Sequence, residues 1–346
     1  AAPSMMVPEA QAAGALYVSA ENAMFNNVFG GAQIIEVVVI NGQDETDEEQ
    51  GEPVVKVDEN QLRMAQGVDG NWYGYFGDKT QVPLADESSY LNFGTDSDPT
   101  IYKGDWAEAS NVYKNQAGSP QNVATNYPTL SAWNNTGTAE GVANASVGQI
   151  GIAQADWPVI QLYDFTIGMF DVVLEQAGAD EVVTLDFNSA DLDDYASLTL
   201  DRSSASQESE IHLVITDNQL NIDPTAEDIV SFWVGGSSLT NGVSWMNRTT
   251  TWGDTDYIAY SNAFDDNGKL IINNATNGGA SILANDATLD DATADNYMIF
   301  YEGGENSGIF YNTDDNDDAS IVVADAAKRG FTATFDYNDS AQSFVV

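Results

Sequence analysis

The chain has 346 residues, of which 54 are acidic and 10 are basic, so its formal net charge at pH 7 is −44. A hydrophobic content of 43% excludes a wholly disordered protein. The charge makes nucleic acid and anionic lipid unfavourable partners, because both repel a polyanion. The sequence has no cysteine, which excludes disulfides, thiolate chemistry and zinc sites built on cysteine.

The excess of carboxylates also opposes compaction, since like charges on one small surface repel unless cations gather around them. We therefore expect bound or condensed cations to belong to the working state. Many of the aspartates lie in turns beside Asn and Gly, which favours local oxygen clusters over solvated helix faces. General surface acidity, as in a salty habitat, is the alternative origin of the charge.

In chain order, residues 1–14 predict an extended N-terminal arm, and alternating apolar residues at 16–20 predict the first strand. A β-branched strand is predicted over 32–40, followed by strands at 54–57 and 62–65. Asp69-Gly70 predicts a two-residue hairpin turn into an aromatic strand at 71–76. Aromatic rings in such a strand are typical of core or interdomain packing, with a carbohydrate platform as the alternative.

From about residue 80 to 155 the sequence is rich in Asn, Gly, Ser and Thr with isolated aromatics. We interpret it as a long ordered insertion on a sandwich domain, with disorder as the competing view. Strands return at 159–165, 169–174 and 181–187, separated by short turns as in all-β sandwiches.

The rest of the chain is organised around residues 196–234, where two alternating strands flank a Ser-rich loop and lead into an Asp/Asn/Pro turn. We place a domain boundary near 197–202. Further strands are predicted at 229–234, 270–272, 296–301, 308–311, 321–323, 331–337 and 342–346. The last reads as a strand cut short, so we expect the natural protein to continue with further domains.

Four segments carry a resemblance to a known family: 62–76 (LRMAQGVDGNWYGYF), 200–207 (LDRSSASQ), 215–228 (ITDNQLNIDPTAED) and 302–310 (EGGENSGIF). They resemble archaeal surface-layer (S-layer) proteins of the type found in ammonia-oxidising archaea. Together with the strand pattern, the resemblance implies an all-β fold of consecutive Ig-like β-sandwich domains with long loop insertions. We expect an arm at 1–14, a first domain at 15–198 and a second at 199–346.

The resemblance further implies a secreted structural protein at the cell surface that assembles with copies of itself into a porous lattice of cyclic, hexameric units. A start at Ala1-Ala-Pro-Ser without an initiator Met agrees with a cleaved signal peptide. Anionic pore walls would concentrate small cations, and ammonium would be among them if the organism oxidises ammonia. No apolar run is long enough to cross a bilayer.

Hard-cation binding is the chemistry that the acidic turns favour, because calcium and magnesium take carboxylate, amide and carbonyl oxygens. We expect Ca²⁺ or Mg²⁺ at one or both of two clusters: Asp217, Asn221, Asp223 and Asp228, and Asp314, Asp315, Asp317 and Asp318. Neither matches the EF-hand spacing. A solvated acidic loop is the alternative for the second cluster, and a plain Asn-Gly turn is the preferred interpretation of 265–268.

Five Asn-x-Ser/Thr sequons are candidates for glycosylation. They lie at Asn134, Asn144, Asn247, Asn274 and Asn338.

An enzyme is not expected. The single histidine, His212, lies within a predicted strand, and neither a Walker nor a Rossmann glycine loop is present. Carboxylates are numerous enough for a two-carboxylate glycosidase, yet no pair is marked by its surroundings. The alternative to a lattice protein is a calcium-dependent adhesin or carbohydrate-binding β-sandwich module.

Overall fold

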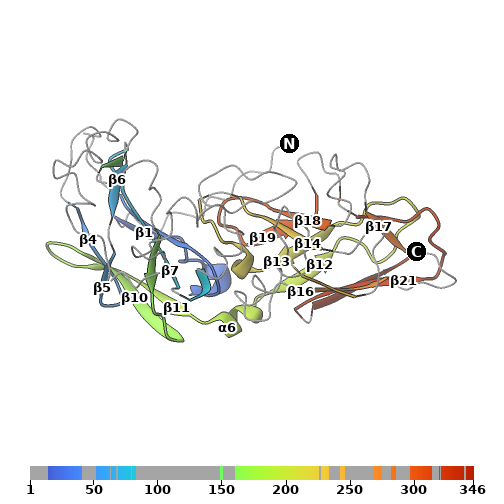
Figure 1. The fold of residues 1–346 in the computed structure, drawn as a ribbon, viewed down its shortest axis with the longest axis horizontal. Helices are drawn as coiled ribbons and strands as arrows, with labels where there is room; N and C mark the ends of the chain where they lie inside the picture. The colour runs from blue at the N-terminus through green and yellow to red at the C-terminus, as the bar shows by residue number, and fades with distance from the viewer. Residues whose placement is uncertain are drawn as a thin grey trace, which may run out of the picture.

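In a computed structural model, the described residues are 15–40, 52–62, 64–67, 69–78, 80–82, 149–150, 160–225, 227–233, 242–245, 269–274, 282–285, 297–313, 319, 321–338 and 340–346. They are mostly β-strand with very short helices, which confirms the all-β prediction. The arm at 1–14 and nearly all of the predicted insertion at 80–155 lie outside these residues. Figure 1 shows two groups of sheets arranged along the long axis of the molecule.

The N-terminal group contains two sheets. The first has the order β1 (Leu16–Val18), β3 (Ile35–Val39), β7 (Trp72–Asp78), β6 (Ala65–Gly67) and β8 (Gln149–Ile150), with β9 (Ile160–Tyr163) parallel to β7. The second has the order β2 (Val28–Phe29), β11 (Glu181–Phe187), β10 (Gly168–Glu175), β4 (Val54–Val57) and β5 (Asn60–Leu62).

One hydrophobic core lies between these two sheets, because alternate residues of each strand point inward. Val37 and Phe76 of the first sheet and Val57 and Leu174 of the second are all buried in it. Aromatic rings surround Phe29, whose centroid lies 5.3 to 6.2 Å from those of four other phenylalanines: Phe76, Phe165, Phe170 and Phe187. Trp72 and Tyr75 are also buried, as the packing interpretation of the aromatic strand predicts.

The C-terminal group contains three sheets. The largest has the order β12 (Ser197–Leu200), β13 (Leu213–Thr216), β19 (Ile309–Tyr311), β18 (Tyr297–Glu302) and β14 (Ile229–Trp233). The second runs β15 (Gly242–Trp245), β16 (Lys269–Asn274), β21 (Thr332–Tyr337) and β22 (Ser340–Val345), and the third pairs β17 (Leu283–Asn285) with β20 (Ile321–Val323). Phe232 packs edge-on against Phe300 and Tyr337 in the core of this group.

Most strands predicted by alternation are confirmed, and β4, β11 and β20 match their predicted ranges residue for residue. The strand predicted at 62–65 is wrong as a single element: its first residue ends β5 in one sheet and its last begins β6 in the other. The Asp69-Gly70 hairpin joins β6 to β7 as predicted, but Gly67 bonds to Asn71, so the loop has three residues with Gly70 at φ 82°. Strands β2, β8, β15 and β17 were not predicted.

The predicted domain boundary at 198/199 falls inside β12, which pairs with β13 of the C-terminal group. The division into two domains stays a prediction. Strand β22 pairs with β21 over its whole length. On its other side Val345 bonds to the backbone of Ser203 and Ala205, so the end of this strand is covered.

We expect Phe76→Ala to lower the free energy of unfolding by about 3–5 kcal/mol, because it removes a ring from the centre of the aromatic cluster and leaves a cavity. Urea unfolding followed by tryptophan fluorescence measures the change. Met169→Ala is the control, since Met169 is 77% exposed and should shift stability by roughly 0.5 kcal/mol or less. Equal effects of the two changes would contradict the core described above.

Candidate functional site

The candidate site is the junction between the two groups, which combines apolar packing with buried polar contacts. Ala32, Ile34 and Tyr75 of the N-terminal group belong to the same hydrophobic cluster as the core of the C-terminal group. The backbone N–H of Ile34 donates to the carbonyl of Ile222 at 3.2 Å. The groups therefore contact each other through continuous packing, beyond the chain connection at α6 (Ser189–Asp193).

The segment 217–223 forms the C-terminal side of the junction. Asp217 caps the short 3-10 helix η4 (Asn218–Leu220), accepting a hydrogen bond from the N–H of Gln219. This helix presents one amide side chain to the N-terminal group and one to α6. Asn218 Nδ2 donates to the carbonyl of Val28 at 3.5 Å, and Gln219 Nε2 donates to that of Ser189 at 3.0 Å.

The hairpin between β18 and β19 supplies the other contact, through Asn306. This residue has φ 56°, in the left-handed region that Asn tolerates better than most residues. Its Nδ2 donates to the carbonyl of Ser19 at 3.0 Å, and its Oδ1 accepts from Asn221 Nδ2 at 2.8 Å. The side chain thus bridges β1's end to the segment after η4.

Two buried carboxylates hold the loops on either side of Asn306. Glu302 accepts from the N–H groups of Ser307 and Gly308 through one oxygen, and from the N–H of Asp228 through the other. Asp228 in turn accepts from the N–H groups of Ile222 and Asp223. Burial, and then the neighbouring charge of Asp228, raises the pKa of Glu302 well above its ordinary value.

A third buried carboxylate, Asp217, lies nearer the second sheet of the C-terminal group. It accepts from the hydroxyl of Tyr337 at 2.6 Å as well as from the N–H of Gln219. Burial raises the pKa of Asp217 to about 6, and these two hydrogen bonds oppose the rise.

All members of the first predicted cation cluster are buried in this part of the structure: Asp217, Asn221, Asp223 and Asp228. Their carboxylates accept protein hydrogen bonds, including two to Asp223 from the N–H and hydroxyl of Thr225. Among the described residues, no group of three or more His, Asp or Glu is arranged to hold a metal ion. Divalent-cation binding here stays a prediction, and 265–268 and 314–318 lie outside the described residues.

Of the candidate glycosylation residues, Asn134, Asn144 and Asn247 lie outside the described residues, and Asn274 ends β16 opposite Ala333. Asn338 is half-buried in the β21–β22 turn, and its Nδ2 donates to the carbonyl of Asp193 at 2.8 Å. That nitrogen, to which a glycan would attach, is therefore a further contact between the C-terminal group and α6.

Glu36 is a residue of this junction that the sequence did not single out. It lies in β3 and is 9% exposed, and no hydrogen bond reaches its carboxylate within the described part of the chain. Burial, and then the charges of Asp223 and Glu305, raises the pKa of Glu36 to about 7. The available signal was a single charged residue within an apolar run, AQIIEVVVI.

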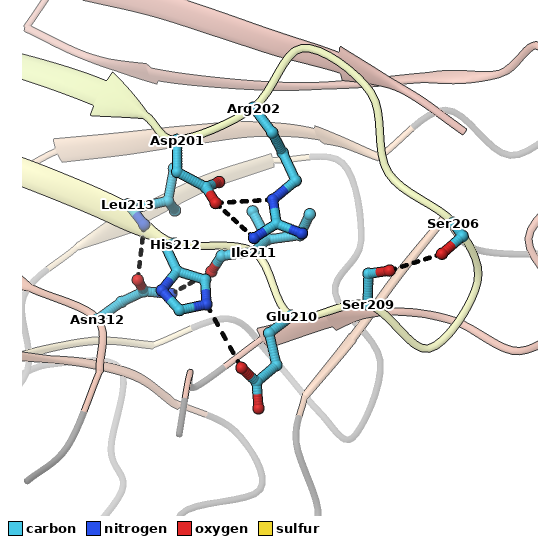
Figure 2. A network of polar contacts seen from close by, with 9 residues as sticks. All are labelled: Asp201, Arg202, Ser206, Ser209, Glu210, Ile211, His212, Leu213 and Asn312. Atoms are coloured by element: carbon cyan, nitrogen blue, oxygen red, sulfur yellow. Dashed lines mark hydrogen bonds and ion pairs between the residues drawn. The ribbon is translucent and has the colours of Figure 1, made fainter. Parts of the chain in front are cut away.

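Figure 2 shows the surroundings of the single histidine. His212 Nε2 lies 3.4 Å from Glu210, while Ser206 and Ser209 bond to each other at 2.8 Å. Arg202 pairs with its neighbour Asp201, and Asn312 bonds to the backbone of Ile211 and Leu213. The imidazole of His212 lies beside the carboxylate of Glu210, but Ser206 and Ser209 bond to each other and not to the imidazole. These contacts therefore stabilise a loop and the edge of a strand.

We expect Asn306→Gly to lower the free energy of unfolding by about 1–3 kcal/mol, because Asn221 Nδ2 loses its buried acceptor and the carbonyl of Ser19 loses its donor. Glycine adopts positive φ without strain, so the change isolates the side-chain contacts. Asn26→Gly is the matched control, since Asn26 also has positive φ (52°) but is exposed. Chemical denaturation measures both, and equal losses would contradict the bridging role of Asn306.

Glu36→Gln should alter the dependence of stability on pH. The pKa of Glu36 is higher in the folded than in the unfolded state. The resulting contribution to stability is fully present below about pH 4.5 and is lost as pH rises through about 7. The wild type should therefore lose about 3 kcal/mol relative to Glu36→Gln between pH 4 and pH 8. Urea unfolding across this range measures the difference, with exposed Glu208→Gln as the control. Parallel profiles for wild type and Glu36→Gln would contradict the raised pKa.

None of the helices in the described ranges combines the length and apolar content needed to cross a bilayer. These helices are short because the fold is built from strands, and they occur only in the connections between strands.

In comparisons with known proteins, no protein-family model matches the chain, and no curated protein sequence matches it.

Proposed function

We propose that this chain is a structural component of a cell-surface layer, a secreted S-layer protein without enzymatic activity, built from consecutive Ig-like β-sandwich domains. Copies assemble into a porous, strongly anionic lattice that binds divalent cations. The observation that supports this most is the junction, because hydrogen bonds and a shared hydrophobic cluster join the two groups of sheets into one extended unit. A lattice protein needs units whose parts keep a constant relative placement.

The charge of −44 gives this unit its second property. The ion pairs found within the described ranges, such as Lys56–Glu175 and Arg202–Asp201, are partly exposed and neutralise few carboxylates. Neighbouring copies would repel unless cations screened or bridged them. Divalent-cation binding and enrichment of small cations, including ammonium, are both consequences of this charge.

The alternative, a carbohydrate-binding module or adhesin, requires aromatic rings in a row on an exposed sheet face. Trp72, Tyr75, Phe76 and Tyr163 are instead buried, and two exposed tyrosines of the described residues, Tyr17 and Tyr311, lie in different sheets. This arrangement supports the lattice protein over the sugar-binding module.

Negative-stain imaging of the purified chain tests the proposal. With millimolar Ca²⁺ or Mg²⁺ we expect ordered sheets, because the cations reduce repulsion between acidic surfaces. A chelator should dissolve them, and NaCl at equal ionic strength is the control for simple screening. Dispersed particles under every condition would refute self-assembly and would make glycan-binding screens the next experiment.

A further inference from the structure

Two hydrogen-bond acceptors at the junction, the carboxylate of Glu36 and Oδ1 of Asn221, lack a donor within the described part of the chain. The Glu36 site consists of Glu36, Tyr17, Asn221, Asp223 and Glu305. Glu36 is only 9% exposed, yet its carboxylate accepts no hydrogen bond in the described ranges. Asn221 is 2% exposed, and its Oδ1 also lacks a partner, while its Nδ2 is used by Asn306.

The register of the first sheet places aromatic rings around this carboxylate. Glu36 pairs directly with Tyr75, and Val38, two residues further along the same face, pairs with both Tyr17 and Tyr73. Tyr17 is 43% exposed and forms the solvent side of the site, together with exposed Glu305. The carboxylates of Asp223 and Glu305 lie close enough to Glu36 to disfavour its ionisation.

The chemistry of the site favours a planar cation that donates N–H groups. Acceptors outnumber donors, several carboxylates lie together, and phenol rings border them. A guanidinium satisfies all three features, because it donates several hydrogen bonds, pairs with carboxylates and stacks on aromatic faces. The described carboxylates show no arrangement that would hold a metal ion.

The chain itself carries a group of this kind in an exposed position. Lys328-Arg329 is the only pair of adjacent basic residues among the 10 in the sequence. Both are exposed in the turn between β20 and β21. Lys56 and Arg202 are paired with carboxylates of their own chain, whereas no ion pair is found for Arg329 within the ranges described.

The turn that holds Arg329 is far from the Glu36 site of its own molecule. The N–H of Gly330 bonds to the carbonyl of Val346, which places the turn beside the C-terminal residue. In Figure 1 this residue lies at the end of the molecule remote from β1. The side chain of Arg329 therefore cannot reach its own Glu36, and only a second copy can bring the two together.

We propose that the Glu36 site of one molecule binds the Arg329 side chain of a second copy of this chain. This inference rests on the proposed function, since it names a contact of the assembly. The two surfaces differ and lie far apart on the molecule, so the contact is heterologous. Such contacts continue from copy to copy until they close into rings or extend without limit, as a lattice requires.

A double-mutant cycle tests the contact. Self-association of wild type, Glu36→Gln, Arg329→Gln and the double variant is measured by sedimentation velocity with millimolar Ca²⁺, the condition under which the proposed function expects copies to associate. Each single change should weaken association roughly tenfold or more, because each leaves a charged partner unpaired. The double variant should be no weaker than either single variant. Arg202→Gln is the matched control and should leave association unchanged, since Asp201 already pairs with Arg202.

Each other result overturns the contact. Unchanged association of Arg329→Gln in a chain that still assembles would refute this contact alone and leave the proposed function intact. Weakening by Glu36→Gln alone would mean that another cation fills the site. Effects that multiply in the double variant would show that the residues act separately. A wild-type chain that does not associate even with divalent cations would refute the contact and the proposed function together.

Discussion

The buried hydrogen bonds between the two groups of sheets are the constraint on which the rest of the structure depends. Asn306 can bond to Ser19 and Asn221 together only when the β18–β19 hairpin lies against the end of β1. Any shift of one group would leave these buried polar atoms without partners, at a larger cost than a shift between apolar surfaces. The apolar part of the junction holds the groups together, and the polar part selects one placement.

The carboxylates of the chain fall into two classes, buried and exposed. Those at the junction, such as Glu302 and Asp228, are buried and serve as acceptors for backbone N–H groups of turns. Such turns could not bury their N–H groups without an acceptor, so these residues stabilise the loops despite the cost of desolvating a carboxylate. Many others remain at the surface, where they contribute little to stability and give the molecule its long-range charge. The buried carboxylates therefore serve folding, whereas the surface carboxylates set the charge on which the proposed assembly depends.

Alternation predicted most of the strands because each has one face in a core, as Val55 and Val57 do in β4. It failed at 62–65, where the chain passes from one sheet to the other within four residues. The oxygen-rich turn at 217–228 was recognised, but the residues that cap N–H groups are the same types that bind calcium, so sequence alone leaves both open. The bond between Ser19 and Asn306 joins residues 287 positions apart, and no local pattern records it.

The absence of cysteine allows the central claim, one fixed placement of the two groups, to be measured directly. Cysteines introduced at Met169 in the N-terminal group and Ser203 in the C-terminal group are both exposed and accept spin labels without competing sites. Pulsed electron paramagnetic resonance then reports the distance between them. A single narrow distance distribution, broadened by Asn306→Gly, is the result expected of a locked junction. A broad distribution in the otherwise unmodified chain would mean that the groups move independently and would contradict it.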